Sequence, residues 1–222
     1  NRRAVHGISL LEAAVWLGLL PLVVYWATYA PAFLYAPGDH PVDPLNFIGQ
    51  HHAMIALQNS VTESHPYQST WRDWIINWRP IWYLYENVDG AQRGVLLIGN
   101  PFTMLAGLAA FGWCLWNGLT WRRPDRIAFA AMFLACLGIW MLPGKPVQFY
   151  YLYLLPSTFL MGCLALALDA LWRTGGWRRS VPVFSLTVSG GLFVWFYPIL
   201  SAAVLHDGPQ AFTMWMWLDS WR

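Results

Sequence analysis

The sequence predicts an all-α membrane protein with about five transmembrane helices and one long outer loop that carries interfacial helices. Of its 222 residues, 57% are hydrophobic and only 11% are charged, and 16 are tryptophans. This composition is unlike that of a soluble domain. A helix needs roughly 20 mostly apolar residues to cross the hydrocarbon. Five such runs occur, at about 8–35, 94–118, 127–142, 147–172 and 181–205.

The arginines predict the orientation, because cationic residues beside membrane spans stay on the cytoplasmic side. They cluster before the first span and in every second connection: Arg2, Arg3, Arg122, Arg123, Arg126, Arg173, Arg178 and Arg179. The amino end is therefore expected inside, and the long loop at about 36–93 and the carboxyl end outside. A net charge of +2, spread over short flanks, gives no reason to expect a nucleic-acid partner.

Several features of the spans are expected to be structural. Pro21 should kink the first span, because it removes a backbone donor in a medium without water. Glu12 should reach the interface or pair with Arg2 or Arg3. The third span is short and would need help from Pro143, flanking aromatics or a thinner bilayer. The three cysteines fall inside spans and are expected as small buried hydrophobes.

The odd number of spans, together with a start at Asn1, predicts that residues 1–222 form a single carboxy-terminal membrane domain of a longer chain. The 36–93 loop is too long for a simple connection, which indicates a functional segment. Asp43 before Pro44 is a helix start, and the following residues have helical spacing, so a helix along the interface is expected. His51 and His52 project about 100° apart and lack a ligand four residues on, so no metal site is expected.

The loop from His65 to Glu86 is densest in polar chemistry. Trp71, Trp74, Trp78 and Trp82 recur at three- and four-residue intervals, which predicts one side of a helix as far as Pro80 allows. An aromatic belt that anchors a surface helix would explain the tryptophans. It would not explain their polar neighbours, since arginine forks suit phosphate and aromatic faces suit sugar rings. These neighbours are His65, Tyr67, Ser69, Arg72, Asp73 and Arg79.

The same loop carries a resemblance to a known family. The run H-P-Y-x-S, followed by W-x-x-W and R-P-I-x-Y, resembles the loop signature of the protein O-mannosyltransferases, in their carboxy-terminal membrane half. Further fragments follow in the same order and extend the resemblance over nearly the whole chain: GNP at 99–101, QFYYLYLLPSTF at 148–159, FYPILS at 196–201, and Trp215, Trp217 and Trp221.

The resemblance implies a multi-span glycosyltransferase of the GT-C class that moves mannose from a polyprenyl-phosphate carrier to serine or threonine hydroxyls of proteins. The reaction would occur on the non-cytoplasmic side of a bacterial plasma membrane. The expected partners are polyprenyl-phosphate mannose, an acceptor protein and the lipid bilayer, with no cofactor besides the donor. A metal requirement and the oligomeric state stay open. In the family the aspartate-glutamate pair with the proposed base lies in the amino-terminal half, so no catalytic residue is expected in this fragment.

Eight residues are predicted to bind the substrate or carrier. His65, Tyr67 and Ser69 would shape the acceptor or sugar region, and Trp71 and Trp74 would supply stacking and interface anchoring. Three further residues have these expected roles, with alternatives for the two cations. Arg79 would hold the carrier phosphate or fix the loop through Asp73 or Glu86; Lys145, in the turn PGKP, would clamp phosphate or face lipid headgroups; and Gln148 would turn its polar edge inward.

Other functions remain open at this point. The acceptor of a GT-C transferase could instead be a lipid or another glycan. A transporter segment is an alternative of a different class. The spans argue against it, because none carries the cluster of mid-membrane charges that ion coupling often needs. A purely structural subunit would explain the aromatic belt but not the polar loop. No phosphate-binding loop or dinucleotide glycine pattern is present, and a carrier-linked sugar needs no nucleotide site.

Overall fold

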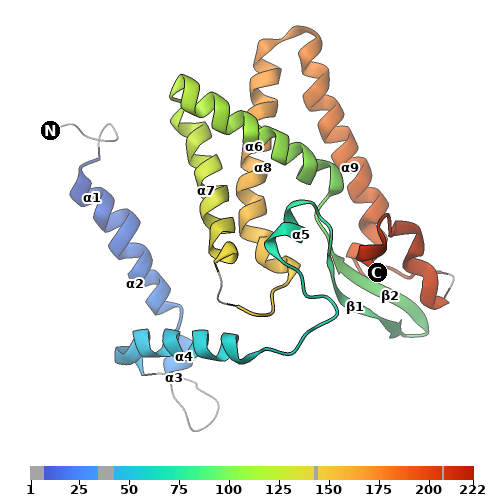
Figure 1. The fold of residues 1–222 in the computed structure, drawn as a ribbon, viewed down its shortest axis with the longest axis horizontal. Coiled ribbons are helices and arrows are strands. Elements are labelled where there is room, and N and C mark those ends of the chain that lie inside the picture. Colours follow the sequence, from blue (N-terminus) through green and yellow to red (C-terminus); the bar gives the residue numbers. More distant parts are fainter. Residues whose placement is uncertain (1–7, 35–42, 143–144, 207) are drawn as a thin grey trace. The chain divides into compact units, whose positions relative to one another are not determined.

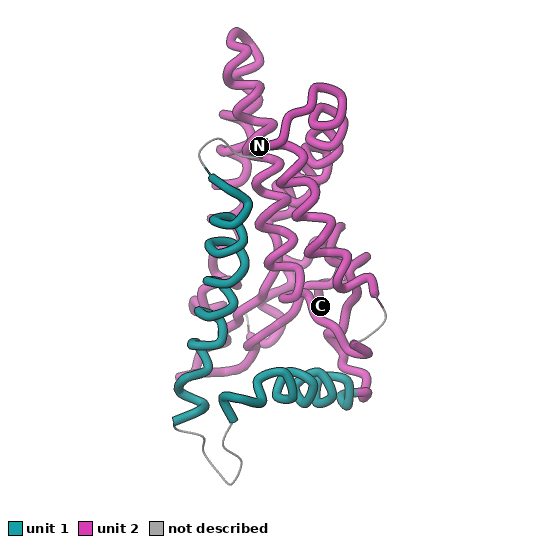
Figure 2. The backbone as a smooth tube through the Cα atoms, turned by 90° about the vertical axis from the view of Figure 1, so that its left-hand side faces the viewer, with its two compact units in different colours: residues 1–61 teal, residues 62–222 magenta. Residues whose placement is uncertain are grey.

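Helices make up most of the computed structural model, which describes residues 8–34, 43–142, 145–206 and 208–222. Within these ranges, five helical segments are long and apolar enough to cross a membrane: Leu10–Ala27, Pro101–Trp121, Pro124–Met141, Tyr150–Thr174 and Gly176–Leu200. The predicted membrane helices are confirmed, with shifted ends. Arg2, Arg3 and Pro143 lie outside the described residues. The chain divides into two compact units, residues 1–61 and 62–222 (Figure 2).

The first unit begins with the first predicted span, built from α1 (Leu10–Ala14), a π-helical turn (Val15–Leu19) and α2 (Leu20–Ala27) (Figure 1). The π-helical turn precedes Pro21, and in it the Leu20 N–H bonds to the Val15 carbonyl. The wider turn accommodates the missing donor of the proline. The helix ends at Ala27, earlier than expected, and α3 (Ala30–Leu34) follows after a turn. Glu12 accepts from the Ser9 N–H at 2.7 Å, so it caps the helix start.

The predicted interfacial helix is present in the same unit. Asp43 accepts from the Leu45 N–H at 2.8 Å and starts a 3-10 turn (Pro44–Asn46) that leads into α4 (Phe47–Ser60). His51 on α4 is held at both ring nitrogens, with Nδ1 2.7 Å from the Phe47 carbonyl and Nε2 2.8 Å from the Tyr25 hydroxyl. This histidine therefore ties α4 to α2. No group of three metal-ligating side chains occurs among the described residues.

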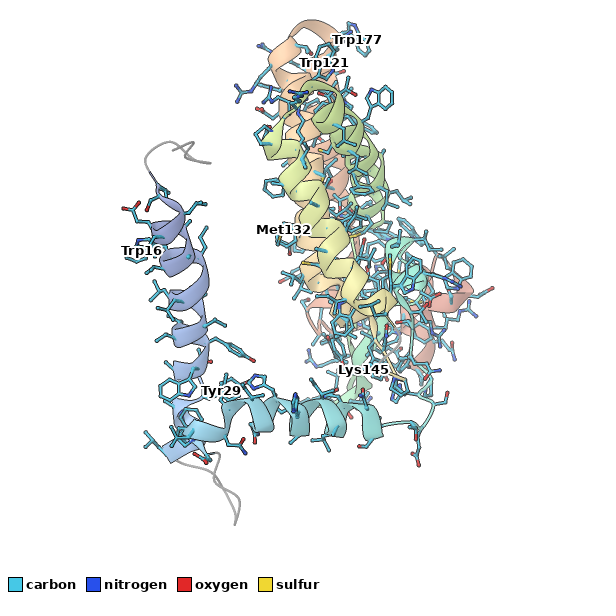
Figure 3. All side chains as sticks on the ribbon, turned by 60° about the vertical axis from the view of Figure 1, so that its left-hand side comes forward. Trp16, Tyr29, Trp121, Met132, Lys145 and Trp177 are labelled. Carbon is cyan, nitrogen blue, oxygen red and sulfur yellow. The ribbon has the colours of Figure 1, made fainter. Side chains whose placement is uncertain are left out.

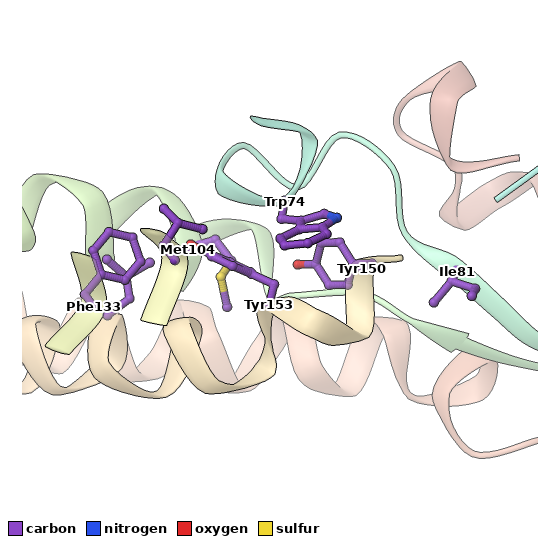
Figure 4. Packing of buried hydrophobic residues seen from close by; sticks show 8 residues of the cluster. Trp74, Ile81, Met104, Phe133, Tyr150 and Tyr153 are labelled. Carbon is purple, nitrogen blue, oxygen red and sulfur yellow. The ribbon is translucent and has the colours of Figure 1, made fainter. Parts of the chain in front are cut away.

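The second unit contains a bundle of four helices: α6 (Pro101–Trp121), α7 (Pro124–Met141), α8 (Leu154–Thr174) and α9 (Ser180–Leu200) (Figure 1). Asn100 caps α6 by accepting from the Thr103 N–H, and Pro101 takes the first position. Close packing of α6 on α8 depends on Gly107, where an added Cβ would lie 2.8 Å from Leu160 Cγ. A buried cluster near the start of α8 includes Trp74, Tyr150 and Tyr153 (Figure 4).

The loop before α6 contains a β-hairpin that the sequence analysis did not predict. Strand β1 (Ile81–Val88) pairs antiparallel with β2 (Ala91–Leu97), so residues 94–97 belong to a strand and not to the second span. Asp89 and Gly90 form the turn, both with positive φ, as a two-residue hairpin turn requires. Every second residue of β2 is buried, from Gln92 through Gly94 to Leu96, which is the period of a half-buried strand.

The carboxyl-terminal segment packs on this hairpin and on α9. It consists of two 3-10 segments, Gly208–Trp215 and Asp219–Trp221. The Trp215 indole donates to the Trp195 carbonyl at 2.7 Å, and the Tyr85 hydroxyl donates to the Pro209 carbonyl at 2.7 Å. Burial raises the pKa of the Tyr85 phenol. The last tryptophans are therefore part of a packed junction.

Candidate functional site

The short helix α5 (Trp71–Ile75) positions the first half of the candidate site. Thr70 starts it: the Thr70 N–H and hydroxyl both donate to the Asp73 carboxylate, at 2.7 and 2.9 Å. The helix ends early because Asn77 adopts a left-handed conformation with φ 56° and Pro80 follows. The prediction of a tryptophan-bearing helix as far as Pro80 is therefore wrong beyond Ile75, because Trp78 lies past the end of α5. Trp82, after Pro80, lies on strand β1.

A hollow of about 230 Å³ lies where α5 meets the end of α7 and the segment before α8. Lys145 and Arg72 both line it, and the guanidinium of Arg72 lies 5.3 Å from the ring centroid of Trp71. Lys145 is at the opposite end of the bundle from Trp121 and Trp177 (Figure 3). The residues that line the hollow are Thr70, Trp71, Arg72, Trp140, Met141, Leu142, Lys145 and Gln148.

Gln148 gives this hollow an unsatisfied polar atom. Its side-chain N–H donates to the Lys145 carbonyl at 3.3 Å, while its buried Oε1 has no hydrogen-bond partner among the described residues. Buried acceptors are nearly always paired, so this oxygen is an exception to the usual pairing beside the hollow. The Gln148 carbonyl accepts from the Ser69 N–H at 2.8 Å, which joins the HPYQS loop to the start of α8.

Ser69 and Trp74 occupy the core beside the hollow. The Trp74 indole donates to the Ser69 hydroxyl at 2.9 Å; Ser69 is 5% exposed and Trp74 is fully buried. Trp74 packs near Tyr153 and Trp140, at centroid distances of 6.4 and 6.3 Å. The structure thus places Trp74 in the packed interior, away from the surface position that interface anchoring would require.

His65, Tyr67 and Arg79 form a second group that does not line the hollow. His65 Nδ1 accepts from the Tyr67 N–H at 3.2 Å, and its exposed ring lies 5.3 Å from that of Phe149. The Arg79 guanidinium donates to the Pro66 and Ser220 carbonyls at 2.6 and 2.8 Å and lies over the Tyr67 ring. Neither Asp73 nor Glu86 receives a hydrogen bond from Arg79, so the expected carboxylate partners of Arg79 were wrong: carbonyls fill that role.

Asn77 connects this region to the membrane helices. Its amide donates to the Gly99 carbonyl at 2.9 Å, and its Oδ1 accepts from the Gly99 N–H at 3.2 Å and from the Tyr150 hydroxyl at 2.7 Å. The Trp221 indole donates to the Asn77 carbonyl at 2.8 Å. Asn77 is 3% exposed and therefore links the α5 segment, the start of α6, the start of α8 and the carboxyl end.

The arrangement brings together three of the eight predicted residues, Trp71, Lys145 and Gln148, and adds Arg72. The charge of Arg72 was visible in the sequence, but only the fold shows that α5 turns it toward the segment after α7. The two cations suit a phosphate group, and the indole offers an aromatic face beside them. No carboxylate is among the described residues that line the hollow.

The fold can be compared with solved structures. The structure resembles that of the Saccharomyces cerevisiae protein O-mannosyltransferase Pmt1-Pmt2 complex bound to the sugar donor, with a TM-score of 0.62 at 23% identity. The match covers 84% of this chain and 28% of the yeast chain. With its five apolar helices, the chain therefore has a multi-span, integral membrane fold, which it shares with the matched part of the yeast protein.

Residues 45–221 match the model of the C-terminal four-transmembrane region of protein O-mannosyltransferase, so the chain belongs to this family. Polyprenol-phosphate-mannose–protein mannosyltransferases of Mycolicibacterium smegmatis and Mycobacterium tuberculosis are 28% and 27% identical, over 95% and 96% of this chain. The Corynebacterium glutamicum relative is 29% identical over 82%. The chain spans about half the length of the mycobacterial relatives, 47% of each.

Proposed function

We propose that this chain is the carboxy-terminal part of an enzyme that transfers mannose from a polyprenyl-phosphate carrier to serine or threonine hydroxyls of proteins. The observation that carries this proposal is the hollow at α5, which Arg72, Lys145, Trp71 and Gln148 line in a member of the mannosyltransferase family. The names of the mycobacterial relatives support the donor and the acceptor class.

The chemistry assigns roles within the hollow. Arg72 and Lys145 offer positive charge to the carrier phosphate, where charge develops as the bond to the sugar breaks. Trp71 offers an aromatic face to the sugar ring, and Gln148 adds a polar side chain to the lining beside it. At about 230 Å³ the hollow is smaller than the roughly 300–1,000 Å³ of complete small-molecule sites, so it suits one phosphate or sugar unit.

The acceptor hydroxyl attacks the anomeric carbon, polyprenyl phosphate departs, and a carboxylate accepts the hydroxyl proton. No carboxylate is among the described residues that line the hollow. The base is proposed to lie in the amino-terminal half, as the resemblance to the family implies. His65 and Tyr67 precede the hollow-lining residues Thr70 and Trp71 in the sequence. They are proposed to contact the acceptor, with the exposed His65 ring as the contact surface. Arg79 is proposed to hold the loop and not the carrier phosphate, because its guanidinium already donates to two backbone carbonyls.

The reaction is proposed to take place on the outer face of a bacterial plasma membrane. The arginine-rich connections after α6 and α8 support this orientation, since such residues are retained on the cytoplasmic side and the hollow lies at the other end of the bundle (Figure 3). Trp121 and Trp177, which are 70% and 78% exposed, are placed as interfacial aromatics at the arginine-rich end.

The test is mannose transfer by the purified full-length protein from polyprenyl-phosphate mannose to a serine- and threonine-containing peptide. Lys145→Gln and Arg72→Gln should each lower kcat/KM about tenfold or more, because each removes one positively charged side chain that contacts the carrier phosphate. Arg122→Gln, at the far end of α6, is the matched control and should retain activity. Transfer to a lipid or glycan but not to peptide would contradict the acceptor, and unchanged activity of both hollow variants would contradict the site.

A further inference from the structure

A second cavity lies along the bundle, from Phe102 near the start of α6 to Arg178 beyond the end of α8. It is a slot of about 620 Å³ between α6, α8 and the start of α9, within the range of small-molecule sites. Ala110 and Leu164 are part of its lining, and Ala167, Phe102 and Phe184 extend its walls. The slot shares no lining residue with the hollow at α5. Helix α8 (Leu154–Thr174) is about 30 Å long, at about 1.5 Å per residue, and the slot is lined by its second half, from Leu164 onward.

The slot is apolar except at one end, where positive charge gathers. Arg178 lines it, and no described residue forms a hydrogen bond or ion pair with the Arg178 side chain. The guanidinium of Arg126 lies 4.4 Å from the ring centroid of Trp113, whose side chain is also part of the lining. Asp169, the one acidic residue in the final turn and a half of α8, is paired with Arg173 at 2.7 Å. Asp125 is likewise paired with Arg123 at 3.2 Å. The arginines at this end therefore outnumber the carboxylates, and Arg178 has no ion-pair partner among the described residues.

We propose that this slot binds one chain of an anionic phospholipid, whose phosphate contacts Arg178. A free phosphate would leave the apolar walls empty, and an uncharged chain would leave Arg178 without a partner. Arginine is suited to phosphate because its planar fork donates two parallel hydrogen bonds. Basic residues at the cytoplasmic ends of spans also attract anionic headgroups, at about 1 kcal/mol per charge. The phospholipid is a bound structural ligand, distinct from the polyprenyl donor, and its binding does not depend on the proposed transfer activity.

Native mass spectrometry of the full-length protein tests the proposal, with dioleoyl phosphatidylglycerol as probe and dioleoyl phosphatidylcholine as the zwitterionic comparison. One phosphatidylglycerol should bind per chain, with higher affinity than phosphatidylcholine. Arg178→Gln should weaken phosphatidylglycerol binding about tenfold and reduce the preference over phosphatidylcholine. Arg222→Gln, which changes an exposed arginine at the carboxyl end, should bind as the parent does.

A second pair of variants tests the apolar part of the slot. Ala167→Phe fills the slot and should abolish the site, whereas Ala165→Phe adds the same ring at an exposed position of α8 that does not line it. Equal phosphatidylglycerol binding by Arg178→Gln and the parent would overturn the headgroup contact. Equal binding by Ala167→Phe, or no lipid bound to the full-length parent, would overturn the slot as a lipid site.

Discussion

The junction around Asn77 and the interior of the helical bundle are stabilised by different interactions. At the junction, side chains bond to the backbone across long sequence separations, as Arg79 does to the Ser220 carbonyl and Trp221 does to the Asn77 carbonyl. In the bundle, α6 and α8 meet through apolar contacts at Gly107 and Leu160. Helical backbone satisfies its own polar groups, whereas the irregular junction must find partners elsewhere. Substitutions should therefore act through lost hydrogen bonds in one region and through sterics in the other.

Asn77→Ala should have the largest effect, because it removes three hydrogen bonds at a buried, left-handed position. The Gly99 carbonyl and the Tyr150 hydroxyl would lose their partner, at a cost of about 3 kcal/mol in the free energy of unfolding. The thermal unfolding midpoint of the full-length protein in detergent measures this loss. Asn87→Ala, at an exposed position of β1, is the control, and equal midpoints for the two variants would contradict the role of Asn77.

Gly107→Ala should destabilise the bundle by about 1–3 kcal/mol, because the new Cβ would lie 2.8 Å from Leu160 Cγ, and Leu160 is fully buried. Gly112→Ala on the same helix meets nothing within 4 Å and should be neutral or stabilising by up to about 1 kcal/mol. Comparison of the two unfolding midpoints isolates packing from helix propensity. A lower midpoint for Gly112→Ala than for Gly107→Ala would show that packing at Gly107 does not decide the difference.

The bundle could be predicted from the sequence and the junction could not, for a physical reason. Long apolar runs fix membrane helices by their length, and outside the bundle Asp43-Pro44 fixes the start of α4 by local capping. The Asn100 cap shows that α6 starts at Pro101, later than the predicted residue 94. The hairpin had only a local signal, Asp89-Gly90, within a stretch whose tryptophans have helical spacing. At the junction, side chains donate to backbone carbonyls that lie far away in the sequence. Nothing local indicates that Arg79 reaches Ser220, or that Arg72 and Lys145 line one hollow.

Arg79→Ala should loosen the junction without unfolding the bundle. The carbonyls of Ser220 and Pro66 would lose a charged donor, so amide hydrogen exchange at 208–222 should accelerate by about tenfold. Arg79→Lys keeps the charge but lacks the fork, and should restore only part of the protection. Unchanged exchange at 208–222 in Arg79→Ala would show that this arginine does not hold the carboxyl end.

Trp82→Phe should have the smallest effect, and it separates hydrogen bonding from packing within the junction. The indole donates to the Trp221 carbonyl at 3.3 Å, a long bond, while its ring packs against Tyr85 and Phe212 at centroid distances of 5.0 and 5.9 Å. Phenylalanine keeps most of this aromatic contact, so the loss should be about 0.5–1 kcal/mol, and exchange at 208–222 should rise less than in Arg79→Ala. Trp82→Ala removes the ring as well and should cost about 3 kcal/mol or more. If Trp82→Phe accelerated exchange as much as Trp82→Ala, the single hydrogen bond and not the aromatic packing would hold the hairpin against the carboxyl end.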